Sequence, residues 1–236
     1  PDVGHYPLVV GEEDHWRHDV RGVEAEQVVG KRTPLRRGDA VAPVVLLVVE
    51  TSIGGTDATP PCPIVYLGSM AEPSIDRPAV PDGYGVPSDK DGVLEWSAVE
   101  RRLEESLHYW MATTRPDGRP HVVPRWGVWM DGRFWYDGSV DTLHARNLHL
   151  NPACVLHLED GKEAVIVEGR SDVAPPPGPM LGKRLATTIT GKYGDAGYSP
   201  QPDSWDGPDS GGLRVFTPIK ALAWFNFPID VTRFRF

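Results

Sequence analysis

The hydrophobic positions of residues 94–236 follow a helical period in two stretches and a strand period in most of the rest. The helical stretches are residues 96–107 and 179–192, where apolar side chains recur every three or four positions. The remaining runs are rich in β-branched and aromatic residues, and turn signals such as Asp131-Gly132 separate them. Strands are therefore predicted at residues 109–114, 121–130, 133–136, 153–158, 163–168, 212–217, 221–227 and 232–236. This pattern favours a mainly β fold of the α+β kind, with an antiparallel sheet and peripheral helices.

A helix-capping signature follows the third of these predicted strands. Residues 139–148 read Ser-Val-Asp-Thr-Leu-His-Ala-Arg-Asn-Leu, so hydroxyl and acidic side chains open a helix. The exposed N–H groups of a helix start attract anions, and we expect a cofactor phosphate to dock there. Taken alone, the same residues also fit a helix-surface arginine and an asparagine that caps a turn. The candidate cofactor-binding residues in and before this turn are Arg125, Trp126, Gly127, Ser139, Thr142, His144, Arg146 and Asn147.

An ordered series of short motifs surrounds this turn. The series comprises Trp96 with Glu100, Ala112-Thr113, Pro116-Asp117-Gly118, residues 128–132, residues 145–148, Asn151-Pro152, residues 165–169, Ala223-Trp224-Phe225 and residues 232–236. With these motifs in this order, the chain from Leu94 to Phe236 resembles the pyridoxamine 5'-phosphate oxidase-like split β-barrel proteins, a family that includes flavin- and deazaflavin-dependent oxidoreductases.

The resemblance implies a six-to-seven-stranded antiparallel split barrel that forms a homodimer, with the cofactor ring at the subunit interface. It also implies that the turn from Ser139 to Arg146 holds the cofactor phosphate. Trp224 is a candidate for stacking near the ring. Arg233 alternates with Phe234 and Phe236 in the last predicted strand, so it is a candidate contact for an anionic substrate or coenzyme tail. FMN-binding members usually place Arg-Lys before the Ala-Arg pair, whereas this chain has Leu143-His144. A leucine cannot contact phosphate, and an ordinary histidine is mostly neutral at pH 7. A weaker phosphate clamp suits the larger deazaflavin coenzyme F-420 or a relative that has lost its cofactor.

The resulting functional prediction is an oxidoreductase that transfers hydride between F-420 or FMN and a small organic substrate. One alternative is an FMN-dependent pyridoxamine 5'-phosphate oxidase. Another is a non-catalytic protein of the same fold that binds a flavin, heme or tetrapyrrole. No catalytic residue is assigned, because in this fold class the protein mainly binds, orients and excludes water.

Other kinds of chemistry find little support in the sequence. Cys62 and Cys154 form no Cys-x-x-Cys pair, the histidines form no His-Glu-x-x-His helix, and no Gly-x-Gly-x-x-Gly run follows a strand. We therefore predict no metal site and no Rossmann nucleotide site. The net charge of −9 argues against nucleic acid as a partner. Two cysteines in 236 residues and the lack of a long apolar run favour a cytoplasmic protein without membrane association.

The predicted domain organisation has three parts. Residues 94–236 form the split-barrel domain, and residues 70–93, rich in Pro, Gly and Asp, form a flexible arm. Residues 1–69 contain no methionine, and Met70 fits a native start, so we interpret 1–69 as spurious upstream translation. The alternative is an authentic N-terminal extension with one strand at residues 42–49.

Overall fold

The computed structural model describes residues 70–207 and 212–236 of the chain. These residues belong to the second of two compact units, which runs from Thr59 to Phe236. The interpretations of residues 1–69, including the strand at 42–49, fall outside the described residues.

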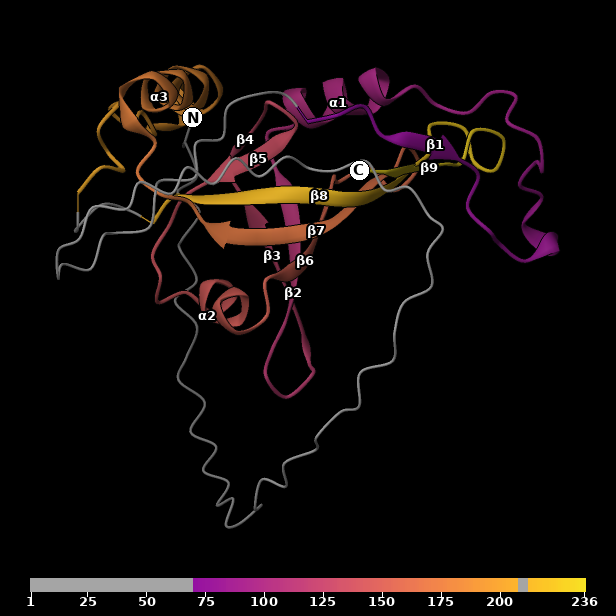
Figure 1. Cartoon of the computed structure of the whole chain (residues 1–236), viewed down its shortest axis with the longest axis horizontal. Helices are drawn as coiled ribbons and strands as arrows, with labels where there is room; N and C mark the ends of the chain where they lie inside the picture. Colours follow the sequence, from indigo (N-terminus) through magenta and orange to yellow (C-terminus); the bar gives the residue numbers. More distant parts are fainter. Residues whose placement is uncertain (1–69, 208–211) are drawn as a thin grey trace, which may run out of the picture. The chain divides into compact units, whose positions relative to one another are not determined.

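The described residues form an antiparallel sheet with three α-helices (Figure 1). The helices are α1 (Trp96–Glu105), α2 (Leu143–Leu150) and α3 (Gly178–Tyr193), with two short 3-10 helices, η1 (Asp82–Tyr84) and η2 (Gly194–Ala196). The strands are β1 (Ser74–Asp76), β2 (Tyr109–Thr114), β3 (Pro120–Arg125), β4 (Val128–Met130), β5 (Arg133–Tyr136), β6 (Ala153–His157), β7 (Val165–Val173), β8 (Arg214–Ala223) and β9 (Thr232–Arg235). The predicted mainly β, antiparallel fold class is confirmed, with nine strands in the described part of the chain where six to seven were expected.

Strand β8 is the branch point of the sheet. The main path runs β1-β9-β8-β7-β6-β2-β3, and β5 pairs with both β4 and β8. Through the β5–β8 pairing, Tyr136 lies opposite Arg214 at the first residue of β8. The end of β5 and the start of β8 therefore meet beside the turn that leads into α2.

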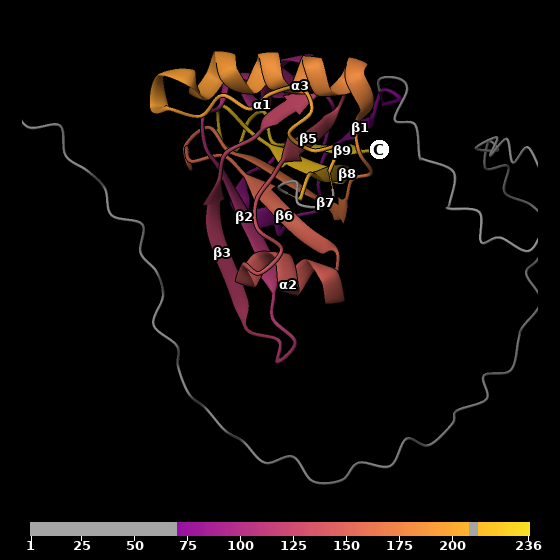
Figure 2. The same ribbon diagram turned by 90° about the vertical axis from the view of Figure 1, so that its left-hand side faces the viewer.

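The side chains of β5 alternate between two hydrophobic cores. Phe134 and Tyr136 join the core that contains Trp96, Val99 and Leu103 of α1. Trp135 joins the other core, which contains Leu185 and Ile189 of α3. Successive side chains of a strand point to opposite faces, so a four-residue strand serves both cores. Helices α1 and α3 lie on one side of the sheet and α2 lies on the other (Figure 2).

The predicted strand at residues 121–130 is wrong as one element, because the structure splits it into β3 and β4 at Trp126-Gly127. The hydroxyl of Tyr193 accepts a hydrogen bond from Gly127 N–H at 3.0 Å and donates one to the Gly127 carbonyl oxygen at 2.8 Å. These bonds occupy the groups that Gly127 would otherwise use in a strand ladder. A Cβ at this position would also lie 2.5 Å from the Phe134 ring and from the Trp135 carbonyl oxygen.

The two strands predicted at residues 212–217 and 221–227 are one continuous strand, β8, which passes through Pro218. Proline has no N–H to donate, so it is tolerated in a sheet at a bulge. Pro218 lies opposite Gly169, where the register of β7 against β8 shifts between Glu168 and Gly169. The bulge therefore accommodates the proline without ending the strand.

Part of the predicted flexible arm, residues 70–93, takes part in the sheet. Strand β1 lies within it and pairs with β9. The guanidinium of Arg77 donates hydrogen bonds to the main-chain oxygens of Asp89, Asp91 and Val231. These contacts tie the residues around β1 to the loop before β9.

The bulge glycine provides a test of the packing between β7 and β8. A Cβ at Gly169 would lie 2.3 Å from the Thr217 carbonyl oxygen and 2.6 Å from the Phe216 ring, whereas nothing lies within 4 Å of one at Gly161. We predict that Gly169→Ala lowers the free energy of unfolding by about 1–3 kcal/mol, as overpacking does in a dense core. Chemical denaturation measures this, with Gly161→Ala in the β6–β7 hairpin as the matched control. Equal stabilities of the two variants would contradict the described packing.

Candidate functional site

The turn between β5 and α2 is folded by its own hydroxyl groups. The Ser139 Oγ accepts a hydrogen bond from the Asp141 N–H at 3.1 Å. The Thr142 hydroxyl donates to the Ser139 carbonyl oxygen at 2.9 Å. Thr142 is the N-cap residue of α2, and its side chain makes no capping hydrogen bond to the helix. We call residues 137–142 the anchor turn, because its N–H groups lead into the helix start that the sequence predicts as a phosphate site.

Two arginines from distant strands lie behind the anchor turn. Arg125 ends β3, and its Nη2 donates a hydrogen bond to the Asp137 carbonyl oxygen. Its guanidinium lies 5.3 Å from the centre of the Tyr136 ring. The buried Arg214 donates from Nη2 to the Ser171 carbonyl oxygen at 3.2 Å and from Nε to the Ser171 hydroxyl at 3.4 Å. Burial lowers the pKa of Arg125, and the charge of Arg214 lowers it further.

Arg125 keeps one donor without a partner. Its Nε is buried and has no hydrogen-bond partner among the described residues. A buried unpaired donor costs free energy, and an anion beside it would recover that cost. The guanidinium also packs tightly against the anchor turn, since a Cβ on Gly138 would lie 2.9 Å from the Arg125 Nη2. These observations fit an anionic group held beside Arg125.

His144 lies in the same cluster and is only 5% exposed. Burial lowers its pKa to about 4, and the charges of Arg125, His121 and Arg214 contribute further. His144 is therefore neutral at pH 7, as the sequence analysis expects. Its neutral ring can donate or accept a hydrogen bond with a ligand but carries no charge. The positive charge of the cluster therefore comes from Arg125 and Arg214. We call Arg125, His144 and Arg214 the cationic cluster.

Two further predicted residues lie beside the cationic cluster. Arg146 is exposed and donates from Nη1 to the Asp141 carbonyl oxygen at 2.6 Å. It lines a cavity of about 370 Å³, which is shared with Arg214, His149, Ala145 and the apolar side chains Val140, Leu150 and Val173. The buried Asn147 instead donates to the Thr113 hydroxyl at 3.0 Å, and so ties α2 to β2. Its amide nitrogen therefore has a structural partner.

Trp126 and Gly127 are adjacent to Arg125 in the chain and are held by Tyr193. The Trp126 ring stacks on the Tyr193 ring with 4.9 Å between centroids and 7° between planes. The Trp126 side chain is nevertheless exposed. The ring therefore packs on α3, whereas the buried Gly127 is held through its backbone.

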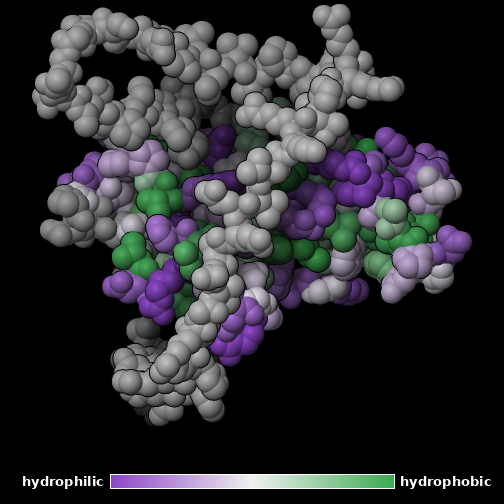
Figure 3. Space-filling model, turned by 60° about the horizontal axis from the view of Figure 1, so that its bottom comes forward, coloured by the Kyte–Doolittle hydropathy of each residue, from purple (hydrophilic) through white to green (hydrophobic). Residues whose placement is uncertain are grey.

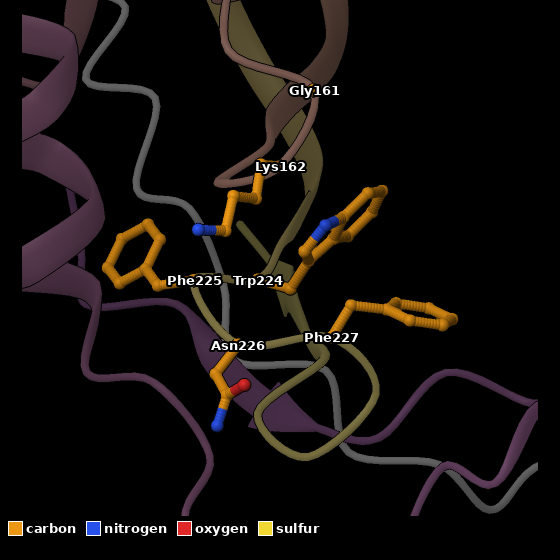
Figure 4. Close-up of a pocket in the computed structure, with 6 residues that line it drawn as sticks. All are labelled: Gly161, Lys162, Trp224, Phe225, Asn226 and Phe227. Atoms are coloured by element: carbon orange, nitrogen blue, oxygen red, sulfur yellow. The ribbon is translucent and has the colours of Figure 1, made fainter.

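The structure does not bring Trp224 and Arg233 to the cationic cluster within one chain. Arg214 begins β8 and Trp224 follows its last residue, so the two are roughly 30 Å apart along an extended strand. Trp224 lines a cavity of about 410 Å³ with Phe225, Asn226 and Phe227, and Lys162 reaches towards it from the β6–β7 hairpin (Figure 4). Arg233 donates two hydrogen bonds of 2.8 Å to the carboxylate of Asp76.

Sequence reasoning missed Arg214, Asp137 and Ser171. No helix cap or turn motif marks Arg214, and its proximity to Arg125 arises only when β8 pairs with β5. Asp137 directly follows the predicted strand at 133–136, which is the one signal that places it near the anchor turn.

Residues 70–207 and 212–236 also bear on the metal, thiol and membrane alternatives. That part of the chain contains no group of three or more His, Cys, Asp or Glu side chains that could hold a metal ion. Burial raises the pKa of the Cys154 thiol to about 12, so this cysteine is a thiol at neutral pH. None of the described helices has the length and apolar character needed to cross a membrane.

A family model described as pyridoxamine 5'-phosphate oxidase matches residues 96–204. Over these residues, which make up a little under half of the chain, the sequence is similar to the pyridoxamine 5'-phosphate oxidase family. The resemblance noted in the sequence is thereby confirmed. The family domain includes α1, the anchor turn, α2 and α3, while Arg214 follows the matched region.

Solved structures similar to this chain include proteins with different stated ligands. An F420 reductase is 24% identical over 52% of this chain and 94% of its own, with a TM-score of 0.40. A FAD-binding protein from Mesorhizobium loti is 18% identical over 60% of this chain and 93% of its own, with a TM-score of 0.43. The heme storage protein of Vibrio cholerae is 18% identical over 52% of this chain and 88% of its own, with a TM-score of 0.41. No curated protein matches the sequence.

The buried His144 predicts a pH dependence of stability. Its pKa is about 4 in the folded chain and 6.5 as an ordinary histidine, so the unfolded chain takes up the proton first. The contribution of the neutral His144 to the free energy of unfolding is complete above pH 6.5 and decreases as the pH drops towards 4. We predict that, between pH 7.5 and pH 4.5, the free energy of unfolding falls by about 2–3 kcal/mol more in wild type than in His144→Gln.

Denaturant unfolding at the two pH values measures this difference. His149→Gln, which removes an exposed histidine of the same helix, is the control and should retain the wild-type pH dependence. An unchanged pH dependence in His144→Gln would contradict the burial and neutrality of His144.

Proposed function

We propose that the chain binds a phosphate-bearing flavin or deazaflavin coenzyme, F-420 or FMN, at the cationic cluster and acts as an oxidoreductase on a small organic substrate. One observation carries the proposal. Arg125 and Arg214 are both substantially buried, yet their hydrogen bonds go to carbonyl oxygens and to a serine hydroxyl. The buried Arg125 Nε also lacks a partner among the described residues. This donor set suits a phosphate.

The protein residues have binding and orienting roles in this proposal. Arg125 and Arg214 supply positive charge, the neutral His144 supplies one hydrogen-bonding nitrogen, and the start of α2 supplies backbone N–H groups. The coenzyme ring, when bound, supplies hydride transfer. Trp126 follows Arg125 in the chain, and its exposed ring stacks on Tyr193.

The cavity beside α2 supports F-420 as the first choice of coenzyme. Arg146, His149 and Arg214 line this cavity, so a long anionic tail that extends past the phosphate meets one further guanidinium, that of Arg146. FMN has no such tail and would use only the cationic cluster. An FMN-dependent pyridoxamine 5'-phosphate oxidase therefore stays the second choice. Heme or tetrapyrrole binding without turnover stays the third.

We further propose that the active form is a homodimer with the coenzyme at the subunit interface. Trp224 and the cationic cluster lie at opposite ends of β8, so one copy cannot place both against the same coenzyme. A second copy could supply the missing end. The exposed apolar side chains Val140, Leu150 and Val173 beside the cationic cluster suit burial in such an interface. Figure 3 shows green apolar atoms interspersed among purple polar atoms on the face turned forward.

Removal of one guanidinium tests the proposed site. We predict that Arg214→Gln weakens F-420 or FMN binding by about tenfold or more, since a hydrogen bond to a charged group contributes about 1.5–3 kcal/mol. Titration followed by tryptophan quenching or coenzyme absorbance measures the affinity. Arg170→Gln, which removes an exposed arginine paired with Asp172, is the control and should bind like wild type.

A flavin or deazaflavin affinity unaffected by Arg214→Gln would place the phosphate elsewhere. A Soret band on addition of heme, without flavin or deazaflavin binding by wild type, would instead support the non-catalytic alternative.

A further inference from the structure

The segment after α3 reaches the anchor turn through one carboxylate. Asp137 Oδ2 accepts a hydrogen bond from the Tyr198 hydroxyl at 2.5 Å and another from the Trp205 indole N–H at 2.8 Å. The main-chain oxygen of the same Asp137 accepts the hydrogen bond from Arg125. One residue thus joins residues 198–205, the anchor turn and the cationic cluster.

Residues 198–205 are fixed by contacts that do not involve Asp137. In α3, a Cβ on Gly182 would lie 2.2 Å from the Pro202 carbonyl oxygen, so helix and segment are in close contact. Trp205 is buried in the core that includes Leu185 and Ile189. The segment is therefore a rigid support for the carboxylate.

The two side-chain donors to Asp137 are both neutral groups. Burial and the hydrogen bond to Asp137 raise the pKa of Tyr198 above its usual value, so this hydroxyl keeps its proton. The carboxylate is therefore held in place without being neutralised by these donors. Its negative charge raises the pKa of Arg125 and would oppose an anion bound nearby. The hydrogen bonds and the charge of Asp137 thus have opposite effects on anion binding, and substitutions can separate them.

We propose that Tyr198 and Trp205, acting through Asp137, are positioning residues for the coenzyme phosphate. They hold the Asp137 carboxylate, which fixes the anchor turn and the guanidinium of Arg125 in the geometry that an anion needs. The identity of the ligand rests on the proposed function, whereas the positioning of the turn does not. Residues that follow α3 thereby control a site built by β3, β5 and α2.

The test compares two substitutions at Asp137. Asp137→Asn keeps an oxygen that can accept the hydrogen bonds from Tyr198 and Trp205, and removes the charge. Asp137→Ala removes both. Tyr198→Phe removes one donor and preserves the ring, and Asp206→Asn, at the exposed carboxylate that directly follows this segment, is the control.

Two properties are measured in the full chain. The first is amide hydrogen exchange at Asp141 and Thr142, whose N–H groups bond within the anchor turn, relative to β6 and β7. The second is the affinity for FMN and for F-420. We expect Asp137→Ala to speed exchange in the turn and to weaken coenzyme binding, each by about tenfold. Asp137→Asn should keep slow exchange and bind the coenzyme at least as well as wild type, and Tyr198→Phe should lie between wild type and Asp137→Ala.

The outcomes separate this inference from the proposed function. If wild type binds a coenzyme and Asp137→Ala binds it equally with unchanged exchange, the positioning role is wrong and the proposed function stands. If Asp137→Asn is as impaired as Asp137→Ala, the carboxylate charge matters and the positioning role is again wrong. If wild type binds neither coenzyme, the proposed function is wrong, and the exchange rates still decide whether Asp137 orders the turn. Should Asp137→Ala fail to fold, the exchange rates and the coenzyme affinity of Tyr198→Phe are compared with wild type instead. Faster exchange and weaker binding would support the positioning role, and unchanged values would contradict it.

Discussion

Strand β8 hydrogen-bonds to β5, β7 and β9 along its ten residues, and the position of the candidate site depends on this pairing. The β5–β8 pair sets Arg214 opposite Tyr136, while the β7–β8 pair brings Ser171 close enough to hold its guanidinium. The bulge at Gly169 lets the strand continue past Pro218, so a single rigid element joins the cationic cluster to the cavity around Trp224. Any change that shifts the register of β8 would therefore move both ends at once.

The cationic cluster is a local exception in an acidic protein. The chain carries a net charge of −9, yet Arg125 and Arg214 lie together near the anchor turn, where burial lowers the pKa of His144 and their charges lower it further. Keeping guanidinium groups out of water is costly unless their donors are satisfied. Carbonyl oxygens and Ser171 satisfy some of these donors, and an anion would satisfy more. In the proposed site, Arg125 and Arg214 supply the positive charge that Leu143 and the neutral His144 do not.

The sequence predicts the local elements well because their signals are local. The helical period of α1 and α3, the strand at residues 109–114 and the turn at Asp131-Gly132 are all present in the structure. The break at Gly127 could not be predicted, because the hydroxyl that causes it belongs to Tyr193, 66 residues away. Arg214 and Asp137 were missed for the same reason, since their roles come from contacts with distant segments. The anchor turn was found through its hydroxyl and acidic residues, although the Thr142 side chain does not cap the helix. Trp224 and Arg233 were also predicted at the site, and one chain does not bring them to it.

We propose above that the cationic cluster recognises the phosphate of a coenzyme. Titration of the same protein with FMN and riboflavin, and with F-420 and its phosphate-free deazaflavin chromophore, tests this recognition. Each pair shares its ring system and differs in the phosphate, with the tail as a further difference for F-420. Two charge-assisted contacts of about 1.5 kcal/mol each predict that the phosphate-free compound binds roughly 100-fold more weakly. Equal affinities within both pairs would contradict the recognition of a coenzyme phosphate by the cationic cluster.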